Sequence, residues 1–134
     1  MDALALANSF RDHHGRVADA LDPALGLHGL RETVRGLFAA AATGTEPVAA
    51  SIAELNRLAR PPHLRWDRDG PALAAEDTAA EVARTAIELL AGGRLRQCGN
   101  PRCILYFLAE GRREYCSDTC SNRTRAARHA ARGV

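Results

Sequence analysis

Residues 98–120 read CGNPRCILYFLAEGRREYCSDTC, and this stretch decides the fold because it holds all four cysteines of the chain. Their spacing is C-x4-C-x12-C-x3-C. Two close pairs separated by a dozen residues suit a tetrahedral ion, because each short loop supplies two sulfurs and the chain between them brings the pairs together. The pattern predicts a metal site built from Cys98, Cys103, Cys116 and Cys120.

Four reduced thiols or two disulfides are the alternatives to a metal site. Asp2 stands where a secretory signal would have a basic residue, and the longest apolar runs are too short to span a membrane. We therefore expect a cytoplasmic protein with no membrane segment, in which paired cysteines favour metal over disulfides. Four sulfurs fill a tetrahedron and leave no position for water, so one structural Zn²⁺ is expected rather than a catalytic one.

The residues between the two cysteine pairs predict a hairpin. Ile104 to Leu108 is expected to form one strand and Arg112 to Tyr115 the returning strand, with a turn at residues 109–111. In the loop before them, Gly99 and Asn100 tolerate the positive φ that tight knuckles demand. Ser117 or Asp118 can cap a helix that carries Cys120 in its first turn. Knuckle, hairpin and helix around one metal would give a treble-clef-like finger.

The charge of the chain is divided unevenly between its two parts. Residues 94–134 carry nine arginines against three acids, whereas residues 1–93 carry nine against thirteen. A basic segment of this kind favours a polyanionic partner, and arginine is the better bidentate ligand for phosphate and guanine. A GC-rich coding sequence would explain the absence of lysine equally well.

The helix after Cys120 sorts into two faces at about 100° per residue. One face, expected to look back at the metal, contains Cys120, Thr124, Ala127 and Ala131. The candidate nucleic-acid contacts are the outward strip Arg125, Arg128 and Arg132, the hairpin residues Arg112 and Arg113, and Asn122 with Arg123. Asn122 and Arg123 could read base edges or brace the knuckle, and the strip could be a merely solvated face. His13 and His14 are expected at the surface.

The first 93 residues predict a mostly α body. Helical spacing of apolar residues is present over residues 2–13, 30–42, 47–60 and 78–91, and Pro23 suits a further helix start. Leu64, Trp66 and Leu73 around Asp69-Gly70 indicate a short hairpin. Gly92-Gly93 marks the expected boundary between a domain of residues 1–93 and a finger of residues 94–134. Metal removal should then unfold residues 95–132 while residues 2–91 keep their helices.

Residues 95–132 resemble the CGNR zinc-finger family, whose Cys-Gly-Asn-Arg appears here as Cys120-Ser121-Asn122-Arg123. The preceding Cys-Gly-Asn-Pro-Arg-Cys and the Tyr-Cys-Ser at residues 115–117 are also similar. In that family the finger follows a helical N-terminal domain called ABATE, and residues 4–9, LALANS, look like its opening motif. The resemblance implies a bacterial, stress-related transcription regulator with structural zinc. Ser121 departs from the family's glycine, and the last cysteine pair is one residue closer than in the family.

The leading interpretation is a DNA-binding regulator in which the basic helix holds DNA and the body senses a small-molecule effector or forms a homodimer. A single finger buries too little surface to be very selective, which favours a dimer or a second partner. The main rival is a protein-interaction module with an acidic protein partner, and a third is a zinc-thiolate stress sensor. An enzyme is not expected, because no nucleophile, base and oxyanion donor stand at recognisable spacing.

Overall fold

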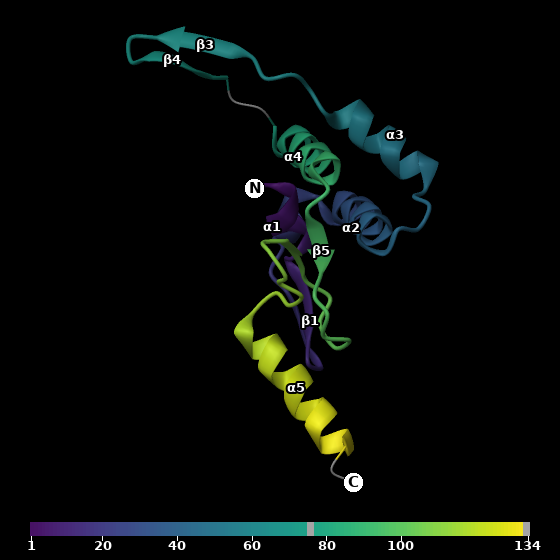
Figure 1. Ribbon diagram of the computed structural model, residues 1–134. Coiled ribbons are helices and arrows are strands. Elements are labelled where there is room, and N and C mark those ends of the chain that lie inside the picture. The colour runs from purple at the N-terminus through teal and green to yellow at the C-terminus, as the bar shows by residue number, and fades with distance from the viewer. Residues whose placement is uncertain (75–76, 133–134) are drawn as a thin grey trace.

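The computed structural model describes residues 1–74 and 77–132 (Figure 1). Four helices belong to the body: α1 (Ala3–Ala7), α2 (His28–Thr43), α3 (Ala49–Leu58) and α4 (Thr78–Gly92). A fifth helix, α5 (Asp118–Arg132), lies at the bottom of Figure 1, at the end of the molecule far from α3 and α4. The described strands pair as three separate antiparallel hairpins. The expected mostly α fold with short hairpins is confirmed.

Capping residues mark the start of α4 and the ends of α2 and α4. Asp77 caps α4 by accepting a 2.7 Å hydrogen bond from the Ala80 N–H, and Gly93 ends this helix at φ 69°. Gly44 ends α2 in the same left-handed conformation, at φ 69°. Such a φ is strained for residues with a Cβ, so glycine is the natural stop. Thr45 bonds the Thr43 hydroxyl instead of capping α3.

The hairpin predicted around Asp69-Gly70 is present. Strand β3 (Leu64–Asp67) pairs with β4 (Gly70–Leu73), with Leu64 opposite Leu73 and Trp66 opposite Pro71. Gly70 has φ 99°, which only glycine adopts without strain. The hairpin extends away from the helices at the top of Figure 1.

The predicted helix over residues 2–13 is wrong beyond Ala7. Strand β1 (Phe10–His13) follows α1 and pairs with β2 (Arg16–Asp19), through a turn at His14 and Gly15 with φ of 59° and 82°. Phe10 continues the helical spacing of the leucines. The turn at His14 and Gly15 nevertheless reverses the chain, so residues 10–13 pair with β2 as a strand. Pro23 begins only a 3₁₀ turn, Pro23–Leu25, before α2.

The predicted finger hairpin is also wrong. Strand β6 (Tyr106–Leu108) pairs with β5 (Leu95–Gln97), which lies before the first cysteine, and residues 112–115 form no strand. Pairing with β5 places Leu95 and Tyr106 in the main apolar core beside Val34, Phe38 and the α4 residues. The Tyr106 ring meets Phe38 edge-on at 5.5 Å. One core therefore includes side chains from both parts of the chain.

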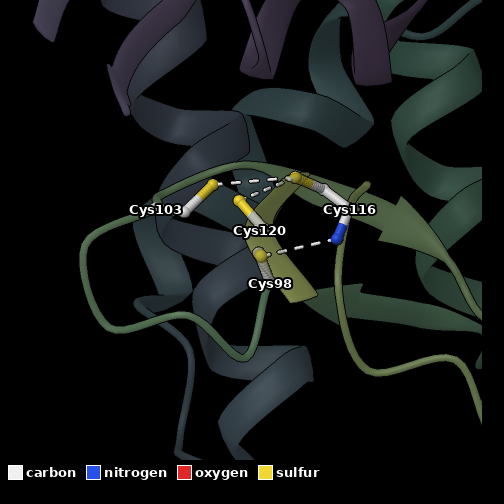
Figure 2. A group of neighbouring side chains, drawn as sticks. All are labelled: Cys98, Cys103, Cys116 and Cys120. Atoms are coloured by element: carbon white, nitrogen blue, oxygen red, sulfur yellow. Dashed lines mark hydrogen bonds between the residues drawn. The ribbon is translucent and has the colours of Figure 1, made fainter. Parts of the chain in front are cut away.

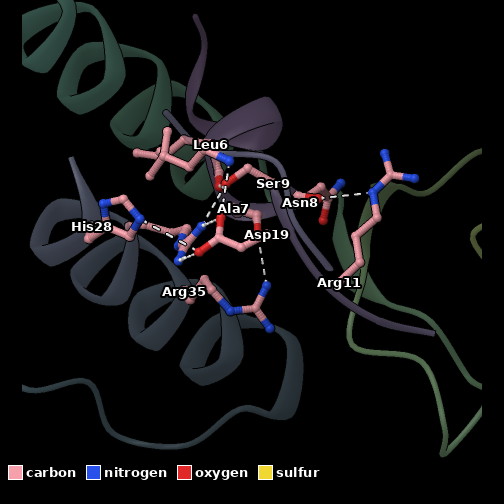
Figure 3. A network of polar contacts seen from close by, with 10 residues as sticks. Leu6, Ala7, Asn8, Ser9, Arg11, Asp19, His28 and Arg35 are labelled. Carbon is pink, nitrogen blue, oxygen red and sulfur yellow. Dashed lines mark hydrogen bonds and ion pairs between the residues drawn. The ribbon is translucent and has the colours of Figure 1, made fainter. Parts of the chain in front are cut away.

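Polar contacts reinforce this junction. The Asn8 amide donates to the Tyr106 carbonyl and accepts from the Tyr106 N–H, both at 2.9 Å. The Arg35 guanidinium donates to the carbonyls of Ala7 at 2.7 Å and Ile104 at 3.2 Å. Figure 3 shows the Arg35 guanidinium directed towards Ala7. Buried backbone groups must be paired, so these contacts fix β6 against α1 and α2.

Candidate metal centre

The four predicted ligands converge on one point (Figure 2). The Sγ atoms of Cys98, Cys103, Cys116 and Cys120 all lie within 4.8 Å of one another. Cys116 Sγ is 3.7 Å from Cys103 Sγ and 3.6 Å from Cys120 Sγ. A zinc–sulfur bond of about 2.3 Å in a tetrahedron separates neighbouring sulfurs by about 3.8 Å. The cluster therefore has the dimensions of a zinc site, and these sulfur separations far exceed a disulfide bond.

The surroundings of the sulfurs also suit a metal. Burial raises the pKa of Cys98, but N–H groups of Cys116 and Asn100 outweigh it and leave the pKa lowered. The Cys116 N–H donates to Cys98 Sγ at 3.4 Å. Burial raises the pKa of Cys103, and it raises the pKa of Cys120 to about 11. Buried thiols this weakly acidic need a cation to become thiolates, so metal binding would release protons.

The knuckle between Cys98 and Cys103 depends on close approach rather than on positive φ. A Cβ at Gly99 would lie 3.0 Å from the Glu114 carbonyl oxygen, which accepts a 2.7 Å bond from the Gly99 N–H. Neither Gly99 nor Asn100 has a positive φ, so the predicted reason for these residues is wrong. Glycine is required because the loop carrying Cys116 passes directly over it.

Asn100 joins the knuckle to α5. Its side chain is buried, accepts from the Arg102 N–H at 2.9 Å and donates to the Cys120 carbonyl at 3.3 Å. Ser117 caps α5 as predicted, since its hydroxyl accepts from the Cys120 N–H at 3.3 Å. On the inner face of α5, Cys120 and Thr124 are buried, whereas Ala127 and Ala131 are exposed. Contact with the metal centre therefore covers only the first turns of the helix.

His14 reaches the metal centre, against the prediction of a surface position. Its ring Nε2 lies 3.6 Å from Cys120 Sγ, and its backbone N–H donates to the Arg102 carbonyl at 3.0 Å. The β1–β2 turn thus touches both the knuckle and a ligand. No local pattern indicates this contact, because the two partners are separated by 106 positions. The sequence offers only Gly15, which indicates a turn at this position but not the contact with Cys120.

The structure places the candidate arginines in two settings. Arg125, Arg128 and Arg132 lie exposed along α5, as do Asn122 and Arg123. Arg113 stacks on Phe107 at 4.7 Å and donates to the carbonyls of Tyr115 and Cys116. Arg112 is exposed in the loop. The α5 arginines present their charge to solvent, while Arg113 braces the loop before Cys116.

A groove lies between the knuckle, the β1–β2 turn and α5. It has a volume of about 590 Å³, and its charged lining comes from Arg102, Arg123 and Arg128. Pro101, Ala127 and Ala131 supply short side chains along the same groove. Arg102 and the β1–β2 turn were not among the predicted contacts. In the sequence, the Asn-x-Arg pattern at residues 100–102 indicates a turn, and in the structure the Asn100 side chain holds the Arg102 backbone in it.

Two family matches divide the chain at the same glycines. Residues 94–133 match the family described as "CGNR zinc finger", and residues 2–93 match the family described as "Putative stress-induced transcription regulator", ABATE. The chain belongs to the ABATE family. Its four-cysteine cluster lies within the matched CGNR finger, which agrees with a metal-binding arrangement. No curated protein matches the chain.

Among the described residues, no helix has the length and apolar character needed to cross a bilayer.

Proposed function

We propose that the chain is a DNA-binding transcription regulator whose four cysteines hold one structural Zn²⁺ in a treble-clef-like finger, with the β5–β6 pair in place of the expected hairpin. The single observation that carries this proposal is the exposed arginine surface of α5, a helix that is fixed at its start by the ligand Cys120. All four sulfurs are engaged in the cluster, so the ion would have no open position for catalysis. Its role would be to hold α5 in place.

The arginines are arranged for a phosphate backbone. Arg125, Arg128 and Arg132 are spaced i, i+3 and i+7, so they follow one strip of the helix. Arg128 also lines the groove with Arg102 and Arg123, and the alanines between them are short enough to allow close approach. Solvent-exposed arginines pair well with phosphates, and each contact releases counterions. The DNA-binding proposal is therefore supported by the positions of these arginines as well as by the net charge of residues 94–134.

An acidic protein would fit the same surface, so the test must separate the two partners. The full zinc-loaded chain is titrated with random duplex DNA at several salt concentrations. Arg125, Arg128 and Arg132 are then replaced by alanine together. The salt slope should fall by about 1 for each residue that contacts a phosphate, and binding to all duplexes should weaken alike.

The control removes the same charge elsewhere. Alanine at Arg57, Arg60 and Arg68, which are exposed on α3 and beyond it, should leave the salt slope unchanged. Arg102→Ala tests the groove separately and should lower the slope by about 1. If the α5 triple variant binds duplex DNA as tightly as the wild type at low salt, the DNA proposal fails and the protein-docking alternative replaces it. Elemental analysis should find one zinc per chain.

A further inference from the structure

The β3–β4 hairpin, residues 64–73, forms an arm that stands clear of the body. Apart from their own pairing, its strands have no extensive contact with another element in the described part of the chain. The other hairpins differ in this respect, because β5 packs on α2 and α4, and the β1–β2 turn touches the metal centre. An isolated two-stranded hairpin is marginally stable in water. The arm therefore lacks the support that such a hairpin needs.

The arm has one apolar face, and that face is uncovered. The register places Leu64 opposite Leu73 and Trp66 opposite Pro71, so these four side chains share a face. Leu64, Trp66 and Leu73 are 72%, 71% and 70% exposed. The other face carries Arg65 and Asp67, which form an ion pair at 3.4 Å. An exposed apolar face backed by a charged one marks an interaction surface.

The body of the same chain offers an apolar groove of about 450 Å³ between α2, α3 and α4. Its lining includes Leu37, Ile52, Leu55, Ile87 and Leu90. On α4 these residues lie in the last turns, whereas the arm joins the helix at its first turn. The arm also points away from the helices in Figure 1. In this conformation, the arm does not cover the groove of its own chain.

We propose that the arm of one copy docks its apolar face on the α2–α3–α4 groove of a second copy, and that the second copy returns the same contact. A second copy fits better than another occupant, because one two-fold axis covers both apolar arms and both grooves at once. Charge does not oppose this pairing, since the arm carries two arginines and two aspartates. Its charged face would remain in water. This dimer does not depend on DNA binding.

Trp66 is the chain's single tryptophan, which makes the arm visible by fluorescence. The full zinc-loaded chain is examined by light scattering after size exclusion over a range of concentrations. The mass should change from one copy to two as concentration rises. The Trp66 emission should move to shorter wavelength over the same range, because docking takes the indole out of water. A monomer with water-exposed Trp66 emission at every concentration would overturn the proposal.

The groove is tested by Ile52→Arg. Ile52 lines the groove and is 42% exposed, so the variant should fold. It should raise the dimer dissociation constant by at least about a hundredfold, because the dimer would bury two unpaired guanidinium groups. Val48→Arg is the matched control, since Val48 is exposed at the start of the same helix and does not line the groove. It should dimerise like the wild type.

Mixing two variants separates this dimer from other assemblies. Ile52→Arg has an intact arm, and Trp66→Ser has an intact groove, so each alone should stay monomeric. Together they can make one of the two contacts, and the emission of Trp66 in the Ile52→Arg chain should then move to shorter wavelength. If Ile52→Arg still dimerises like the wild type, the arm docks elsewhere and the proposal fails. The proposal also fails if the Trp66 emission lies at the shorter wavelength while the chain is a monomer.

Discussion

Helices α4 and α5 are both fifteen residues long, yet they are held in different ways. Ala80, Val82, Ala83 and Ala86 of α4 are buried, and the helix packs on α1, α2, α3 and β5. Only Cys120 and Thr124 of α5 are buried, and in the described chain α5 has no extensive contact with another element. The comparison shows that apolar packing places α4, whereas α5 is held at its first turns by the cysteine cluster and by Asn100, and its later turns are exposed.

Metal removal should have the largest effect and should act on α5 alone. Structural zinc contributes roughly 10 to 16 kcal/mol in finger peptides, and no apolar core replaces it under α5. Because β5 and β6 pack in the core of the body, chelation should abolish amide protection over residues 118–132 while α4, β5 and β6 stay protected, which narrows the range of 95–132 that the sequence indicated. Hydrogen exchange with mass spectrometry measures both. Cys120→Ser should give the same pattern. Loss of α4 protection on chelation would contradict the view that apolar packing alone holds α4.

Phe38→Ala should have the next largest effect, and it should act on the core regardless of metal. Phe38 is fully buried and contacts Tyr106, so the variant should lose about 3 to 5 kcal/mol of unfolding free energy. Urea unfolding of the zinc-loaded and chelated chains measures this loss. It should be equal in both, because Phe38 belongs to the core cluster and not to the cysteine cluster. A loss confined to the zinc-loaded form would contradict it.

A matched pair of substitutions compares the two helices directly. Ala83→Leu overpacks a fully buried position of α4 and should cost about 1 to 3 kcal/mol. Ala130→Leu makes the same change at an exposed position of α5 and should stay within about 0.5 kcal/mol. Thermal unfolding of both variants against the wild type tests the difference. Equal losses would mean that α5 is packed in solution.

Acid should have the smallest effect on the body. The Arg31 guanidinium donates to both carboxylate oxygens of Asp19, at 2.7 and 2.8 Å, and holds the Asp19 pKa well below its usual range. This stabilisation is complete above the ordinary carboxylate pKa and is lost as pH falls through the lowered one. Asp19→Asn should therefore be less stable at neutral pH and lose less on acidification. Chelated protein is used, so that zinc release does not contribute.

Sequence reasoning located the features whose signals are local. The apolar spacing over residues 78–91 and Gly93 located α4, Asp69-Gly70 located the turn of the arm, and the cysteine spacing identified all four sulfurs of the cluster. In each case the residues that determine the structure are neighbours in the chain, so their spacing carries the information. The mostly α fold with short hairpins could be predicted on the same basis.

The features that sequence reasoning missed depend on distant partners. β5 pairs with β6 across the knuckle, and Tyr106 bonds Asn8 across 98 positions. His14 and Cys120 are further apart still. Residues 112–115 had the length of a strand, but Arg113 stacks on Phe107 and bonds nearby carbonyls instead. Tertiary contacts of this kind leave no periodic trace, so one sequence cannot reveal them.

The place of Leu95 and Tyr106 in the main core also has a consequence for biosynthesis. As the chain leaves the ribosome, α1 to α4 emerge first, but the apolar side chains that complete their core follow later. The core of the body therefore stays incomplete until β6 has left the exit tunnel. A chain that ends after α4 would lack these two side chains and would expose apolar surface that a chaperone could bind.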